Sequence, residues 1–180
     1  MFIVLVALLV TGASLAVWDS RQTVTQDYQT NQAKMGLVLA EQATRALQVV
    51  DLVIRGIQEE IDEEKIDTPD AFRKYMSTEN RFHQLQARQE RMPQLEALVV
   101  LDAGGHAINN SRVWPPSGAA ESDTDVFVHF QSISDSGAYI SIPQRSAVSL
   151  DWAVYLARRI TGRDGQLIGI VSAAISLRYF

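Results

Sequence analysis

The sequence predicts an α+β domain in which a long N-terminal helix packs on an antiparallel sheet of about five strands. Two observations lead to this class. No proline occurs between Val24 and Ile66, where apolar residues recur at spacings of three and four, as on one face of a helix. Beyond Pro93 the period becomes strand-like, with glycine-containing turns between short apolar runs. Helices followed by a run of strands are the order typical of an α+β domain.

The apolar segment from Phe2 to Trp18 contains no charged residue. Its length of about 17 residues reaches the lower limit for a helix that crosses a hydrocarbon core roughly 30 Å thick. A cleaved signal peptide is the alternative, because Ser14 and Ala16 are small enough for a signal peptidase, but no Lys or Arg precedes the segment. We expect residues 1–18 to form a transmembrane helix that anchors the chain in the cell membrane.

Residues 19–67 are expected to form a long signalling helix with one apolar stripe. About forty helical residues extend roughly 60 Å at 1.5 Å per residue, which is more than a small domain covers. Part of the stripe should therefore pack on the domain, and part should face a second copy of the helix in a homodimer. A stripe that is entirely intramolecular core is equally compatible with the pattern. The stripe consists of Met35, Leu39, Ala43, Ala46, Val50, Val53, Ile57 and Ile61.

Residues 68–180 are expected to form the folded domain. Thr68 and Pro69 suit the N-cap and the first position of a helix, which should break near Ser77 and resume as far as about Arg91. A long loop should follow the first hairpin, with a short helix or turn after it. The expected strands lie at 95–101, 106–111, 138–142, 151–160 and 167–177, the tight turns at 102–105 and 163–165, the long loop at 114–125 and the short helix or turn at 127–130.

Composition excludes several classes of function. The net charge of -5 and the scattered basic residues argue against a nucleic-acid surface. The absence of cysteine excludes disulfides, thiolate metal sites and thiol nucleophiles. His83, His106 and His129 are isolated from one another, so we expect no metal site and no cofactor. No arrangement of a nucleophile with a base suggests an enzyme.

Several motifs occur in a characteristic order. A proline-ended helix precedes Leu-Glu-Ala-Leu-Val-Val-Leu-Asp at 95–102 and its Asp-x-Gly-type turn, and Ser-Arg-Val-Trp-Pro-Pro follows at 111–116. Arg-Arg-Ile stands at 158–160, and Gly-Ile-Val at 169–171 leads into Leu-Arg-Tyr-Phe at 177–180. In this order the chain resembles the extracytoplasmic Cache-type (PAS-like) sensor domains, and most closely the double-Cache subtype of bacterial diguanylate cyclases and sensor histidine kinases.

The resemblance implies the ligand-sensing part of a membrane-anchored bacterial signalling receptor, facing the extracytoplasmic side. Residues 68–180 would be the membrane-distal module, and the output domain, a diguanylate cyclase or histidine kinase, would lie outside this chain. One motif departs from the family. Where the family often has Asp-Arg-x-Tyr-Phe, this chain has Asp-Val-Phe-Val-His at 125–129, so ligand inferences that use that Arg and Tyr do not transfer.

The fourth expected strand carries a candidate binding face. Alternate side chains of a strand face opposite sides of the sheet. Trp152, Val154 and Leu156 should therefore share one face and pack on the long helix. Tyr155 and Arg159 share the other face with two alanines, as in the floor of a small polar pocket. The alternative is that Tyr155 is plain core and Arg159 a surface ion-pair partner.

Flanking segments supply further candidates. In the family such loops close over the sheet, so an Arg there could bind a ligand carboxylate with two parallel hydrogen bonds. Alternatively, Arg112 pins the loop to Asp123 or Asp125, and Tyr139 is equally suited to a pocket wall or to the core. The expected ligand is a small polar or anionic metabolite, such as an amino acid or a carboxylate. The candidate ligand-binding residues are Arg112, Trp114, Asp125, Tyr139, Arg145, Tyr155 and Arg159.

A second class of function uses the same fold differently. The chain could be a ligand-free dimerisation or protein-interaction module, anchored to the membrane, with the helix stripe as its interface. An open polar face beside Tyr155 and Arg159 would favour the sensor, and a filled, dry face would favour the interaction module.

Overall fold

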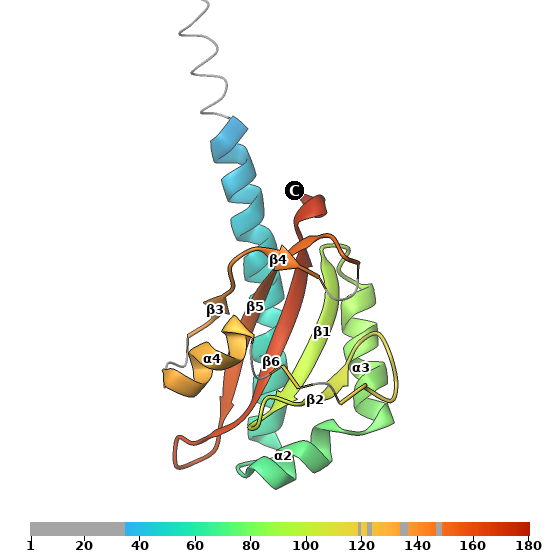
Figure 1. Ribbon diagram of the computed structural model, residues 1–180, viewed down its shortest axis with the longest axis vertical. Helices are drawn as coiled ribbons and strands as arrows, with labels where there is room; N and C mark the ends of the chain where they lie inside the picture. Colours follow the sequence, from blue (N-terminus) through green and yellow to red (C-terminus); the bar gives the residue numbers. More distant parts are fainter. Residues whose placement is uncertain (1–34, 119, 122–123, 134–136, 147–148) are drawn as a thin grey trace, which may run out of the picture. The chain divides into compact units, whose positions relative to one another are not determined.

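The computed structural model describes residues 35–118, 120–121, 124–133, 137–146 and 149–180 (Figure 1). The chain divides into two compact units, residues 1–44 and residues 45–180. The transmembrane helix expected at 1–18 lies outside the described residues. No helix among the described residues is both long and apolar enough to cross a bilayer.

The second unit contains an antiparallel sheet of six strands rather than the expected five. The strands pair antiparallel in the order β2-β1-β6-β5-β3, and β4 also pairs with β5. The additional strand is β4, which follows Pro143 and has only two residues, too few for an alternating pattern to reveal it. The strands are β1 (Leu95–Asp102), β2 (Ala107–Asn110), β3 (Tyr139–Ile140), β4 (Gln144–Arg145), β5 (Trp152–Thr161) and β6 (Leu167–Ser176).

The helices begin where their capping residues predict. Thr68 Oγ1 accepts a hydrogen bond from the Ala71 N–H and Pro69 occupies the first turn, which confirms the expected start. The expected break also occurs, because Thr78 caps a second helix. Helical backbone covers residues 35–63, followed by α2 (Pro69–Met76), α3 (Glu79–Glu90), α4 (Asp125–Ser132) and the 3-10 turn η1 (Leu177–Tyr179).

The long helix packs on one face of the sheet, as expected. Val50, Ile54, Ile57 and Ile61 are fully buried, at spacings of three and four that place them on one side of the helix. They belong to a core that also contains Phe72 from α2 and apolar residues of β1, β5 and β6. The buried part of the stripe begins at Ala46, whereas Met35 and Leu39 in the first unit are exposed.

The helix α4 covers the opposite face of the sheet (Figure 1). Val126, Phe127 and Phe130 of α4 form a second apolar cluster with Leu101, Ala157 and Ile170 of the sheet. The turn after β1 permits this contact, because Gly105 has a φ of +80° and a Cβ there would lie 3.0 Å from the Phe127 ring. The central strands are therefore buried on both sides.

One ion pair joins β5 to the long helix. Arg158 Nε lies 2.6 Å from Asp51 Oδ1 and Arg158 Nη2 lies 3.1 Å from Asp51 Oδ2, a two-point contact in which Arg158 is buried. Arg55 Nε also donates a hydrogen bond to Asp51 Oδ2, at 2.9 Å. Burial alone would raise the pKa of the Asp51 carboxyl, but the hydrogen bonds and charges of Arg158 and Arg55 outweigh it, so the pKa lies below its ordinary value.

We expect Asp51→Asn to lower the free energy of unfolding by about 1.5–3 kcal/mol, because it leaves a buried guanidinium without its charged partner. A carboxyl whose pKa is lowered by folding stabilises the protein above its unfolded pKa of about 3.9, and that contribution is lost as the pH falls through the lower folded value. Urea unfolding between pH 7 and 2.5 should therefore show a smaller loss of stability for Asp51→Asn than for the wild type. Asp62→Asn, at an exposed position of the same helix, is the control and should behave as the wild type.

Candidate functional site

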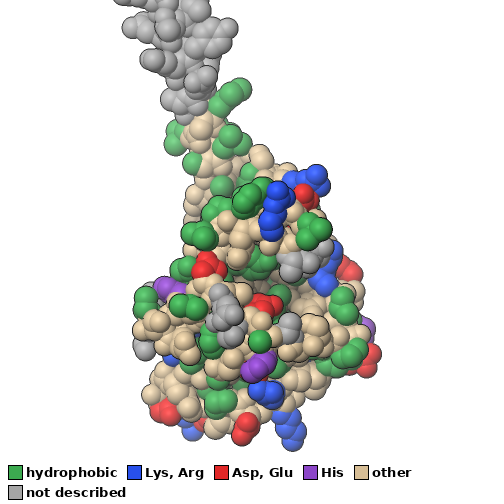
Figure 2. Space-filling model, viewed as in Figure 1, with side chains coloured by type: hydrophobic (Ala, Val, Ile, Leu, Met, Phe, Trp, Pro, Cys, Tyr) green, Lys and Arg blue, Asp and Glu red, His purple; other side chains and the backbone are tan. Residues whose placement is uncertain are grey.

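The face of the sheet beneath α4 brings together two of the candidate aromatic residues. Tyr139 of β3 lies opposite Ala157 of β5, so both side chains are on the same face. Strand alternation places Tyr155 there as well, and both tyrosines are half-buried against the second apolar cluster. Figure 2 views this side of the molecule, on which hydrophobic side chains are scattered among polar ones.

Asp125 and Tyr139 form a polar contact between α4 and β3. The Tyr139 hydroxyl donates to Asp125 Oδ2 at 3.3 Å, and the same oxygen accepts from the Ile142 N–H at 3.3 Å. The Tyr139 ring stacks on His129 with a centroid distance of 4.0 Å. Burial raises the pKa of the Tyr139 hydroxyl above its ordinary value, and the charge and hydrogen bond of Asp125 raise it further.

Arg159 lies on the same face of β5 as Tyr155 and is 5% exposed. Its Nη1 is 3.4 Å from the Ile133 carbonyl oxygen and its Nη2 is 3.3 Å from the Gly165 carbonyl oxygen. Arg159 is therefore a buried cation that contacts backbone oxygens, and not the surface ion-pair partner considered as the alternative.

Arg145 lies with Trp152 at the end of the sheet. The two residues are register partners, the guanidinium lies 4.8 Å from the Trp152 ring centroid, and Nη1 donates to the Leu150 carbonyl oxygen at 2.8 Å. Trp152 is 51% exposed and does not belong to the core that contains the long helix, which corrects the expectation that it packs there. Alternation fixes the side on which Trp152 lies, but its place at the first residue of β5, beside the short strand β4, leaves it in contact with solvent.

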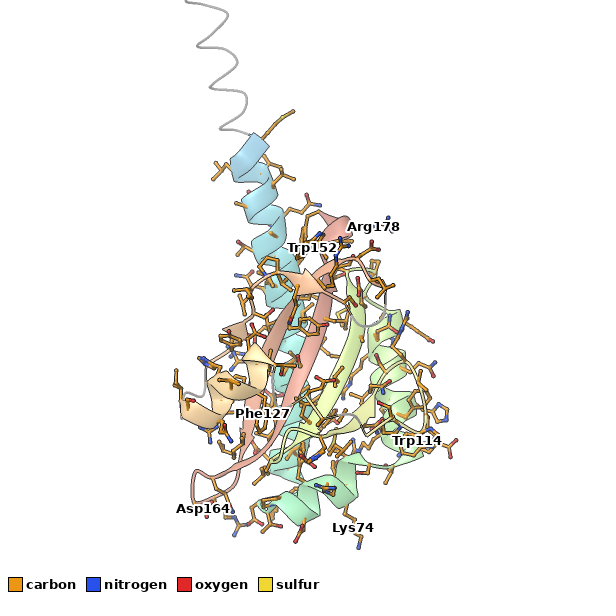
Figure 3. All side chains as sticks on the ribbon, viewed as in Figure 1. Lys74, Trp114, Phe127, Trp152, Asp164 and Arg178 are labelled. Carbon is orange, nitrogen blue, oxygen red and sulfur yellow. The ribbon has the colours of Figure 1, made fainter. Side chains whose placement is uncertain are left out.

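Arg112 and Trp114 are not brought to the face that holds Tyr155. The Trp114 ring lies 6.1 Å from the ring of Phe82 in α3, and Figure 3 shows it beside that helix. Arg112 is exposed, and its backbone N–H donates to Asn110 Oδ1 at 2.8 Å. No ion pair between Arg112 and Asp125 occurs within the described residues, and Asp123 lies outside them.

Two polar residues near this face were not predicted from the sequence. Ser172 of β6 is buried on the side of Ile170 and Ala174, and it is the one hydroxyl inside an apolar run, which is a signal that the sequence offers. Glu121 precedes α4, and burial raises the pKa of its carboxyl above the ordinary value. Its backbone N–H donates to the Gly105 carbonyl oxygen at 2.8 Å, which holds it beside the turn after β1.

Two grooves of about 400 and 490 Å³ lie on the helical side of the domain and share Glu64, Tyr75 and Arg81. Glu60 accepts hydrogen bonds from Arg81 and Arg88 of α3, so this part of the acidic helix end binds a neighbouring helix. Within the described residues, no group of three or more His, Cys, Asp or Glu side chains is placed to hold a metal ion.

Comparison with known proteins identifies the fold. No family model and no curated protein matches the chain. Among solved structures, the extracellular domain of a protein assigned as a histidine kinase has a TM-score of 0.62 and 28% identity, over 77% of this chain and 53% of that one. The ligand-binding domain of a Pseudomonas aeruginosa PAO1 amino-acid chemoreceptor in complex with GABA has a TM-score of 0.53 and 15% identity, over 74% and 58%. The V. cholerae DctB histidine kinase sensor domain has a TM-score of 0.50 and 15% identity, over 72% and 50%.

These similarities confirm the resemblance to Cache-type sensor domains at the level of the fold. The solved relatives are extracellular ligand-binding and sensor domains of membrane receptors. The chain spans about half the length of the solved domains that it matches.

We expect Asp125→Asn to lower the pKa of Tyr139 toward its ordinary value, because the substitution removes the negative charge that opposes ionisation of the phenol. Carbon-13 NMR of the tyrosine Cζ atoms, titrated from pH 8 to 12, measures this change. Asp151→Asn is the matched control, because Asp151 pairs with Arg178 and not with a tyrosine. An unchanged Tyr139 titration in Asp125→Asn would show that the carboxylate does not act on the hydroxyl.

Proposed function

We propose that this chain, which has the fold of extracytoplasmic Cache-type sensor domains, is the ligand-sensing part of a bacterial membrane receptor. The face of the sheet beneath α4 binds a small polar or anionic metabolite, and the long helix carries the resulting change toward a cytoplasmic output domain. The chain itself is a sensor and not a catalyst.

Because α4 packs on the candidate face and Arg159 is buried there, this face is not open, and an open face would have favoured the sensor. The proposal is supported instead by β5, which links the candidate face to the long helix. The side chains of Tyr155 and Arg159 lie on the α4 side. The Arg159 carbonyl oxygen accepts a hydrogen bond from Gln58 of the helix at 3.0 Å, and the adjacent Arg158 binds Asp51 of the same helix. A shift of β5 under a ligand therefore acts on the helix through two polar contacts that are one residue apart.

Such coupling requires two states with different ligand affinity. In the proposed mechanism, the ligand favours the state in which α4 closes on the sheet, since the contact between Asp125 and Tyr139 joins α4 to β3. The helix then adopts the position that the Gln58 and Asp51 contacts impose. Solved relatives support a small-molecule ligand, because the amino-acid chemoreceptor of the same fold was solved with GABA.

The rest of the receptor is part of the same proposal. In this proposal residues 1–18 anchor the protein in the inner membrane, residues 19–67 form the signalling helix, and residues 68–180 form the membrane-distal sensor module. A second module and an output domain, a histidine kinase or a diguanylate cyclase, belong to the remainder of a longer receptor.

A homodimer through the long helix is part of the proposal, and it also serves the alternative function of a ligand-free interaction module. Val49 and Leu52 are 46% and 66% exposed on the side of the helix that leaves the core. Gly56 follows them toward the end of the helix. A Cβ added at Gly56 would have no neighbouring atom within 4 Å, so another helix can approach closely there. Arg45, Val49, Leu52 and Gly56 follow one another at spacings of three or four residues.

The ligand prediction is tested by thermal melting of the full chain in detergent micelles against amino acids, carboxylic acids and neutral metabolites. A ligand present at about 100 times its dissociation constant should stabilise the domain by about 2.7 kcal/mol. Tyr155→Phe and Asp125→Asn should weaken that stabilisation, because each removes a polar group from the face. If no compound raises the melting temperature, the interaction module is the better description.

The dimer prediction is tested by sedimentation equilibrium of the same preparation. Leu52→Asp should raise the dimer dissociation constant at least about tenfold, because it places a charge in an apolar helix contact, and tenfold corresponds to about 1.4 kcal/mol. Val128→Asp, at an exposed position of α4, is the matched control and should leave self-association unchanged. A dimer that tolerates Leu52→Asp would exclude this face. Val50 and Val53 are unsuitable for the test, because both belong to the intramolecular core.

A further inference from the structure

Arg159 has an atom that its own domain does not satisfy. Its Nε is buried and has no hydrogen-bond partner, and no salt bridge joins its guanidinium to a described carboxylate. The two other guanidinium nitrogens contact carbonyl oxygens at 3.4 and 3.3 Å, near the limit for a hydrogen bond. Arg158, the next residue, shows the contrast, because its guanidinium meets the Asp51 carboxylate with two contacts.

A buried cation without a counter-charge is costly, because transfer from water removes hydration that weak carbonyl contacts replace only in part. Buried polar groups in native proteins are almost always paired, so an unpaired donor on this face of the sheet requires an explanation. The guanidinium offers two parallel N–H groups, a geometry that matches a carboxylate.

Ser172 has the same deficiency on the same face. It is 4% exposed, and its Oγ is buried without a partner. Ser172 lies opposite Ala157, and Arg159 lies opposite Ile170, so the two polar residues are diagonal neighbours on β5 and β6. Residues in that relation lie about 7–8 Å apart, with their Cβ atoms somewhat closer. Among the described residues, these are the two buried polar side-chain atoms that lack a partner, and both lie on the side of the sheet that α4 covers.

We infer that Arg159 and Ser172 are the two residues that make polar contacts with the ligand. The ligand is a small carboxylic acid with a second hydrogen-bonding group, such as a hydroxy acid or a dicarboxylic acid. Arg159 binds the carboxylate through Nε and one Nη, and the Ser172 hydroxyl binds the second group. This inference rests on the proposed function and adds to it the chemical class of the ligand and a specificity-determining residue, Ser172.

The probes are the sodium salts of glycolate, lactate, malonate and succinate, with the corresponding amides as neutral counterparts at the same ionic strength. They are added to the full chain in detergent micelles. At least one acid should raise the melting temperature and shift the Arg159 Nε–H signal in a proton–nitrogen NMR spectrum, assigned by its loss in Arg159→Lys. Its amide should do neither.

Variants separate ligand binding from stability. Arg159→Met should abolish the effect of the acid and leave the ligand-free melting temperature unchanged or higher, because it removes an unpaired buried charge. Ser172→Ala should weaken binding of the acid about tenfold without lowering the ligand-free melting temperature. Arg178→Lys, at an exposed arginine that pairs with Asp151, should bind as the wild type does.

Three outcomes would overturn the inference. Acids and amides could have equal effects, binding of the acid could survive Arg159→Met, or Arg159→Met could lower the ligand-free melting temperature, which would make Arg159 a structural residue. In the first two cases the domain still binds a small molecule, so the proposed sensing function stands. Failure of every compound in the wider screen would instead overturn the sensing function itself.

Discussion

Burial of β5 on both of its faces is the constraint on which the rest of the structure depends. One face packs Val154, Leu156 and Ile160 with the core that contains the long helix, and the other packs Ala157 and Tyr155 with the α4 cluster. In this position a charged residue without a partner lowers the stability of the fold, on either side of the strand. Arg158 has one in Asp51, whereas Arg159 contacts only carbonyl oxygens, and this asymmetry between neighbouring arginines distinguishes the structural side from the candidate binding side.

The same strand explains how a sensor of this fold can transmit a signal. The long helix is held by apolar packing of Val50, Ile54 and Ile57, which resists separation but allows small shifts. Directional contacts to β5 come from Asp51 and Gln58. In the proposed mechanism, a ligand on the α4 face would act on a helix that is already fixed to the other side of the same strand. The grooves near Tyr75 and Arg81 lie on the helical side and have no part in this route.

Much of the fold could be predicted from local pattern. The capping residues Thr68 and Pro69, the hairpin turns and the alternation of β5 each act over a few residues, and each was placed correctly. The candidate site was predicted only in part. Tyr139, Tyr155 and Arg159 lie on the expected face, but Trp114 packs on Phe82 of α3 and Arg145 stacks on Trp152. The path of a long loop depends on contacts with distant elements, and sequence spacing does not encode those contacts.

The sequence by itself determined the class of the domain, the two-sided character of β5 and the exclusion of thiol chemistry, because periodicity and composition are properties of the chain alone. Only the tertiary structure decided which polar groups are satisfied. Ser172 and Arg159 are thirteen positions apart and become neighbours through the register of β5 and β6. Whether a buried donor has a partner depends on every element that reaches it, so the unpaired Nε and Oγ could be found only after the sheet, α4 and the β5–β6 turn were assembled.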